Sequence, residues 1–176
     1  RRNLVHVGLS VTTLDPDLCR RLELRAPTPD RRLATLRDLA GAGVPVRVMV
    51  APVIPVLTCH EIESILAAAA GAGARAASWI LLRLPHEVAP LFRDWLETHV
   101  PGKAAHVLKR LRAMRGGADY DAEWGKRMRG EGVEADLIAR RFLVAARRHG
   151  LDRPLPALDC TAFAAPPRAG DQLSLF

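Results

Sequence analysis

Apolar and polar residues follow two different periodicities along this chain, and the clearest apolar stretch covers positions 46–55. It consists of Val, Met, Ala, Ile and Pro, with Arg47 as its one charged residue. A short β-branched run closed by prolines is typical of a strand buried on both faces, and such strands belong to parallel sheets flanked by helices. Helical patterns precede and follow the run, ending at 41–43 and 71–73 in Gly-Ala-Gly. The run is therefore predicted to be the middle strand of a β-α-β-α-β unit.

Two more strand patterns complete this unit, and every later pattern is helical. β-forming residues cover 4–13 and 76–84. Amphipathic spacing then predicts helices at 86–99, 103–115 and 133–149. The sequence thus predicts an α/β fold with three parallel strands, followed by an α-helical extension.

Three β-α units cannot close a barrel, and an isolated three-stranded parallel sheet would leave strands of buried type at its edges. The chain also begins without Met, directly before a strand pattern. We therefore expect a C-terminal part of a longer protein. Its predicted organisation is a barrel half at 1–100, a basic helical extension at 101–150 and an extended, Pro-rich tail at 151–176.

Positive charge is concentrated in the predicted extension. The net charge of the chain is +7, and residues 103–153 hold 13 basic and 7 acidic side chains. Such a segment suits a nucleic-acid backbone, and a solvated Arg-rich surface is the alternative. No apolar run approaches the roughly 18 residues of a membrane span. Three scattered cysteines do not make a disulfide scaffold, so we expect a cytoplasmic protein without a membrane partner.

Hydroxyl groups mark the carboxyl end of the first predicted strand, where ligands of parallel α/β proteins bind. Ser10, Thr12 and Thr13 lie there, and their hydroxyls can bond a ribose, an amino group or a carboxylate. The alternative is a Thr-rich strand end that caps the next helix.

The loop after the middle strand, residues 51–61, is the second candidate. Its apolar side chains could pack on a flat nucleobase, and its backbone amides could bond the edge of that base. Thr58 and Glu61 also have the spacing of a capping box, which is the structural alternative.

The last five residues form the clearest short motif. They follow a segment rich in Pro and Gly and combine a polar anchor with two leucines and an aromatic residue, a pattern typical of a peptide ligand for a hydrophobic groove. A tail that docks on its own domain is the alternative. The residues are Gln172, Leu173, Ser174, Leu175 and Phe176.

Six short motifs lie along the chain in a characteristic order and spacing: Ser10–Pro16, Met49–Pro55, Leu81–Glu87, Met114–Gly117, Arg127–Gly130 and the terminal pentapeptide. Together they resemble the C-terminal half of radical S-adenosylmethionine enzymes. The most similar group is related to spore photoproduct lyase and is often called the DNA repair photolyases. The resemblance implies a partial (β/α)6 TIM-type barrel, of which this chain supplies the fourth, fifth and sixth strands.

The resemblance also implies residue roles in binding S-adenosylmethionine. The hydroxyls of the first strand would contact its ribose or methionyl part, and Arg25 would meet its carboxylate. The second loop would hold the adenine, and the end of the third strand would complete the pocket. The residues of these last two elements are Val53, Ile54, Thr58, Leu82 and Arg83. The terminal pentapeptide is similar to the motif that binds the bacterial DNA sliding clamp.

Two departures from the family pattern matter. The family loop usually reads Pro-x-Ile-Pro-Gly, and Val56 stands where Gly would permit a positive φ. The three-cysteine motif that binds the [4Fe–4S] cluster is absent, so this chain alone is not expected to cleave S-adenosylmethionine. The longer protein is expected to be a lyase-like enzyme that acts on nucleic acid through a 5′-deoxyadenosyl radical. The alternatives are a non-catalytic DNA- or clamp-binding module, and a radical enzyme acting on tRNA or protein.

Overall fold

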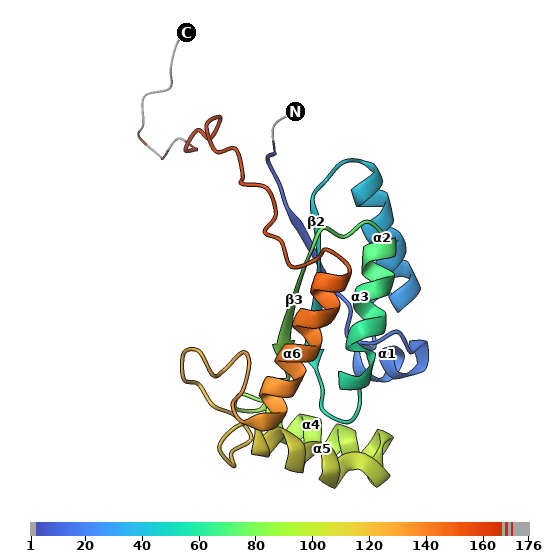
Figure 1. The fold of residues 1–176 in the computed structure, drawn as a ribbon. Helices are drawn as coiled ribbons and strands as arrows, with labels where there is room; N and C mark the ends of the chain where they lie inside the picture. Colours follow the sequence, from blue (N-terminus) through green and yellow to red (C-terminus); the bar gives the residue numbers. More distant parts are fainter. Residues whose placement is uncertain (1–2, 167, 169, 171–176) are drawn as a thin grey trace.

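Three short strands pair into one parallel sheet that is joined and covered by helices, as the sequence predicts (Figure 1). The computed structural model describes residues 3–166, 168 and 170. The elements are β1 (Val7–Ser10), α1 (Pro16–Leu22), α2 (Pro29–Gly41), β2 (Val46–Val53), η1 (Cys59–Glu61), α3 (Ile62–Gly71), β3 (Ala76–Leu81), α4 (Val88–His99), α5 (Pro101–Ala113) and α6 (Val133–Arg148).

The sheet has the order β1-β2-β3, so the strand predicted to be central is central. Met49 of β2 lies beside Ser10 of β1 and Ser78 of β3. The outer strands are shorter than the sequence predicts, with regular pairing only over 7–10 and 76–81. The register of β2 and β3 shifts between Val50 and Val53, and the peptide bond between Ala51 and Pro52 in this stretch is cis.

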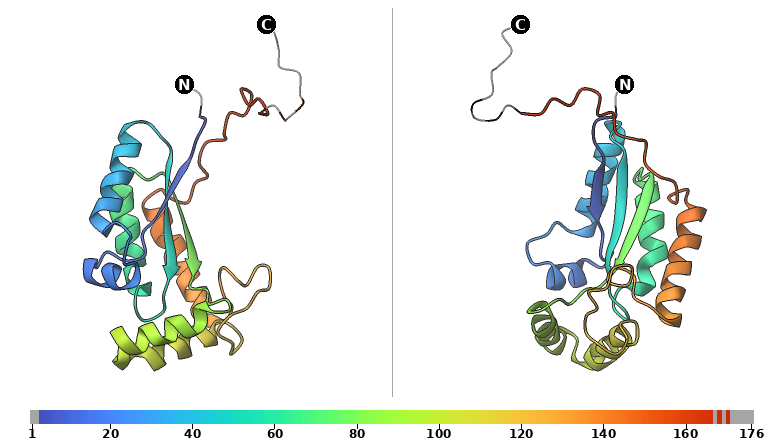
Figure 2. Two further views of the ribbon diagram at one scale, coloured as in Figure 1. Left: turned by 180° about the vertical axis from the view of Figure 1, so that it is seen from behind. Right: turned by 90° about the vertical axis from the view of Figure 1, so that its left-hand side faces the viewer.

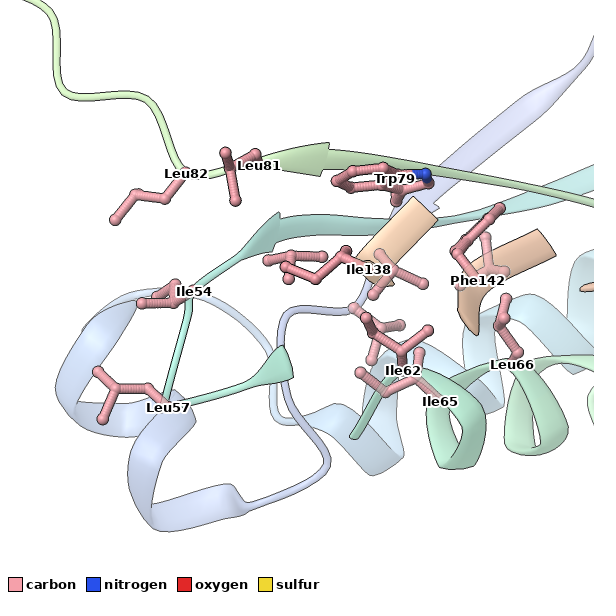
Figure 3. Close-up of a cluster of buried hydrophobic side chains, with 14 of the residues drawn as sticks. Ile54, Leu57, Ile62, Ile65, Leu66, Trp79, Leu81, Leu82, Ile138 and Phe142 are labelled. Carbon is pink, nitrogen blue, oxygen red and sulfur yellow. The ribbon is translucent and has the colours of Figure 1, made fainter. Parts of the chain in front are cut away.

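Helices α2, α3 and α6 lie on one face of the sheet (Figures 1 and 2). Both crossovers run between neighbouring strands in the same direction, and their common right-handedness puts α2 and α3 on the same side. Val46, Val48 and Val50 are buried against this helical layer. Trp79 of β3 meets Phe142 of α6 with ring centroids 6.2 Å apart, inside the apolar cluster of Figure 3.

The opposite face of the sheet is covered far less. Arg47, Met49, Ser78 and Ile80 alternate with the buried residues of their strands and are only half-buried. At the amino ends of the strands the tail lies beside this face, where Leu155 lines a small pocket with Gly8, Arg47 and Met49. Most of this face is therefore open in the described structure (Figure 2).

The three helices after β3 divide into two groups, and the predicted boundary at residue 100 falls between α4 and α5. Helices α4 and α5 pack together beyond the carboxyl ends of the strands, whereas α6 returns along α3 and joins the helical layer (Figure 1). After α6 the chain contains no helix or strand through residue 166, as expected for an extended tail. Asn3 holds this tail by donating to the carbonyls of Pro156 and Ala157. The terminal pentapeptide lies outside the described residues, among which no helix is long and apolar enough to cross a membrane.

One ion pair links α6 to α3 and gives a pH-dependent prediction. Arg141 donates to both carboxylate oxygens of Glu63 at 2.8 and 2.6 Å, and this hydrogen bonding lowers the pKa of Glu63 below its ordinary 4.5. Replacing Arg141 by Gln should therefore cost about 0.5 kcal/mol of stability at pH 7, since both side chains are partly exposed.

The sign of the pH effect follows from the lowered pKa of Glu63. The pair stabilises the fold above the pKa that Glu63 has in the unfolded chain, and the gain is lost as pH falls through the folded-state pKa. Urea titrations should show the cost of Arg141→Gln at pH 7 and its disappearance in acid. Arg140→Gln is the matched control, because within the described residues Arg140 forms no ion pair. Equal costs for both variants would contradict the prediction.

Candidate ligand site at the carboxyl ends of the strands

Ser10 at the end of β1 lies beside a buried arginine that sequence reasoning missed. The Arg32 Nη1 atom donates to the Ser10 carbonyl at 2.9 Å and lies 3.4 Å from its Oγ. The same guanidinium pairs with Glu23 at 2.7 Å and is only 7% exposed. Arg32 is four positions before the buried Leu36 on the inward side of α2. Because residues four apart share a helix face, this spacing could have indicated that Arg32 points inward. Arg32 thus fixes both the end of β1 and the turn between α1 and α2.

The hydroxyls of Thr12 and Thr13 are buried and bonded within the chain. Thr12 donates to the Ala51 carbonyl at 3.1 Å, and Thr13 donates to Glu61 at 2.6 Å. The second carboxylate oxygen of Glu61 accepts from the Leu14 amide at 2.6 Å. Glu61 therefore closes the end of β1, a role that the sequence did not reveal. These two threonines hold β1, β2 and η1 in place, whereas Ser10 is half-buried.

The loop after β2 folds tightly upon itself. The Ile54 carbonyl accepts from the amides of Leu57, Thr58 and Cys59 at 3.2, 2.9 and 3.2 Å. Thr58 Oγ1 accepts from the Ile54 amide at 2.9 Å and makes no cap bond to the following helix, so the capping-box alternative is wrong. Val53 and Ile54 are 1% exposed. A ligand at this loop would therefore meet the half-buried Pro52 and Val56 and the backbone, with Val53 and Ile54 supporting them from below.

At the end of β3, Leu82 and Arg83 are attached to the segment 114–131, which connects α5 to α6. The Leu82 amide donates to the Val53 carbonyl at 2.9 Å, which brings the ends of β2 and β3 together. Arg83 donates to the Tyr120 hydroxyl at 3.0 Å, and its guanidinium lies 5.7 Å from the centre of the Tyr120 ring. The end of β3 and this segment therefore form one surface.

Arg115 is the main attachment of this segment. It is 3% exposed, and it donates to the carbonyls of Leu82, Lys126 and Arg127 at 2.9, 3.1 and 2.9 Å. Among residues 3–166, 168 and 170, its Nε finds no hydrogen-bond partner. Burial lowers the pKa of Arg115 and the nearby charge of Arg83 lowers it further, while Asp121 opposes both effects. The motif around Arg115 and the motif at 127–130 are thus joined in space.

The structure brings most of the predicted cofactor-binding residues to one end of the sheet. Arg25 differs, because it is exposed in the turn between α1 and α2, and no contact in the described structure joins it to the strand ends. Three or more His, Cys, Asp or Glu side chains never converge as a metal site within residues 3–166, 168 and 170. Cys19 lies in α1, Cys59 in η1 and Cys160 in the tail after α6. The described residues therefore do not fit an iron–sulfur cluster.

Comparison with known proteins adds relatives without a described activity. The chain is 33% identical over 146 residues to "Uncharacterized protein Rv2578c" of Mycobacterium tuberculosis and, to the same extent, to "Uncharacterized protein Mb2609c" of Mycobacterium bovis. The match covers 82% of this chain and 42% of each relative, so the chain spans less than half of their length. No protein-family model and no solved structure matches the chain.

Val56 offers a direct test of the loop backbone. Its φ of 69° lies in the left-handed region, where a Cβ atom costs about 1–2 kcal/mol. Val56→Gly should therefore be more stable than Val56→Ala by about 1 kcal/mol, which reverses the usual order of the two residues. Thermal or urea unfolding measures the difference. The same pair of variants at Val44, which is also half-buried but has a negative φ, should keep the usual order.

Gly130 tests the attachment of the segment 114–131 to β3. Gly125 and Gly130 both have positive φ, 91° and 73°. A Cβ at Gly130 would lie 2.8 Å from a Leu81 methyl and from the Met114 carbonyl, whereas one at Gly125 would meet nothing within 4 Å. Both replacements by Ala lower the stability by placing a Cβ atom at positive φ. Gly130→Ala should lose about 1–3 kcal/mol more, because its Cβ is also overpacked. Equal losses of stability would contradict the prediction, because they would show that Leu81 and Met114 move aside for the added Cβ at no cost.

Proposed function

We propose that this chain is the C-terminal half of the partial barrel of a radical S-adenosylmethionine enzyme, similar to the spore photoproduct lyase group. The observation that carries the proposal is the sheet with helices on one face. Parallel strands are normally covered on both faces, because each face is apolar. Here α2, α3 and α6 cover one face, while Met49, Ser78 and Ile80 remain half-buried on the other. If this face lined the interior of a barrel, these half-buried side chains would be covered as well.

The two edges of the sheet support the same proposal. At the outer edge of β3, the amide of Ala77 donates to Leu151 and that of Leu81 donates to Met128, both at 2.9 Å. At the other edge of the sheet, formed by β1, the Arg32 guanidinium donates a hydrogen bond to the Ser10 carbonyl. A further strand fits beside β1 better than beside β3. The greater length of the mycobacterial relatives agrees with additional strands on that side.

In the proposed enzyme this chain binds and orients the cofactor. Ser10 lies on the open face beside Met49, and its hydroxyl would bind the ribose or methionyl part. The loop at 52–58 would place its backbone against the adenine, and Leu82 with Arg83 would close the pocket. When bound to a cluster held by the rest of the protein, S-adenosylmethionine supplies a 5′-deoxyadenosyl radical. The Arg-rich α5 and α6 would contact nucleic acid, and the terminal pentapeptide would bind a sliding clamp.

The test uses the longer protein that this proposal requires. After anaerobic reconstitution with iron and sulfide and reduction by dithionite, it should bind S-adenosylmethionine and release 5′-deoxyadenosine, detected by chromatography. Ser10→Val should weaken cofactor binding about 10-fold or more, because it replaces one charge-assisted or two neutral hydrogen bonds by methyl groups. Ser64→Val, on the exposed side of α3, is the matched control and should bind normally. Failure to bind the cofactor would overturn the proposal.

A further inference from the structure

An exposed tryptophan on the segment 114–131 has no role in the cofactor site described above. Trp124 is 83% exposed, whereas Trp79 is buried and Trp95 half-buried. The guanidinium of Arg127 lies 4.3 Å from the centre of the Trp124 ring. An exposed indole costs free energy in water unless it serves a partner, and an Arg stacked against it holds the ring in one orientation.

The segment that carries Trp124 is fixed to the end of the sheet. Arg115 bonds the carbonyl of Arg127, so the residue that stacks on Trp124 is tied to the buried guanidinium through its own backbone. The Leu81 amide donates to Met128 at 2.9 Å, and Arg129 lies over the buried Trp79 ring at 4.4 Å. Trp124 is therefore presented beside the carboxyl end of β3, where Arg83 also lies.

Positive charge on this surface is only partly neutralised. Three of the four acidic side chains of the segment form ion pairs, Asp119 with Arg93 and Arg112, and Glu123 and Glu131 with Lys126. The fourth, Asp121, accepts from the Glu123 amide, and its charge acts on the buried Arg115. By contrast, within the described chain three arginines of this surface that are not fully buried form no ion pair with a carboxylate: Arg83, Arg127 and Arg129. Cationic groups beside an exposed aromatic ring match the phosphates and base of a single nucleic-acid strand.

We infer that Trp124, backed by Arg127, is a stacking site for an unpaired nucleobase, and that the strand's phosphates lie along Arg83 and Arg127. This inference rests on the proposed action on nucleic acid and assigns the element that would hold the substrate strand. The free face of the indole stacks on the base, and every base has a suitable face, so the site recognises single strands with little sequence preference.

The experiment measures the binding of a fluorescein-labelled single-stranded oligothymidylate by fluorescence anisotropy, using the chain without cofactor. Trp124→Leu should weaken binding about 5- to 100-fold, and Trp124→Phe should weaken it less, because Phe retains a ring. The salt slope should stay unchanged in both variants. Arg127→Gln should lower the slope by about 0.7, as expected for one lost phosphate contact on a single strand. Trp95→Phe is the control and should bind like the wild type.

An oligomer of the same length without bases separates stacking from other roles of Trp124. Wild type and Trp124→Leu should bind this abasic strand equally. If Trp124→Leu binds the normal strand like the wild type, or if its loss persists on the abasic strand, the inference is wrong and Trp124 serves another partner, such as a protein segment. Absence of binding by the wild type would also overturn it. These outcomes do not depend on S-adenosylmethionine, so they are distinct from a failure of the enzyme proposal.

Discussion

Burial of one face of the parallel sheet is the constraint on which the rest of this structure depends. β2 pairs with both neighbours, and its inward valines lie beneath α2 and α3. The apolar area buried there stabilises the fold at roughly 25 cal/mol per Å², and it also fixes where the strands end. Because all three strands are parallel, their carboxyl ends meet at one edge. Every polar feature of the candidate site follows from that convergence.

Arg115 extends the same arrangement to a distant part of the sequence. A buried guanidinium is costly unless its donors are bonded, and here three backbone carbonyls supply most of the partners. Two of those carbonyls belong to the segment 114–131, and one belongs to the residue after β3. Loss of Arg115 would therefore release the segment and leave the carbonyls of Leu82 and Arg127 without this donor, while the Lys126 carbonyl would keep the amides of Arg129 and Gly130. The tight fit of Gly130 against Leu81 adds a steric constraint at the same place.

The fold was more predictable from the sequence than the site was. The β-branched run at 46–50 and the helical periodicities are local signals, and the structure confirms three parallel strands with their helices. Val56 was also a local signal, because the position where Gly was expected has a positive φ. The hydrogen bonds of Arg32, Glu61 and Arg115 were not predicted, because the groups that they bond lie at other positions along the sequence. From the sequence, the Thr13 hydroxyl at the strand end could bind a ligand, but in the structure it donates its hydrogen bond to Glu61.

The open sheet face and the Trp124 surface meet at β3, and this limits what kind of substrate the proposed enzyme can take. The face between β1 and β2 offers small and flexible side chains, namely Gly8, Ser10 and Met49, which suit a ligand lying against the strands. The outer side of β3 offers Arg83, Arg127 and an exposed indole, which suit a charged polymer. A cofactor against the first surface and a strand on the second would approach each other at the end of β3. An unpaired base reaches such a junction more readily than a base within a duplex, because it has no pairing energy and less stacking energy to lose.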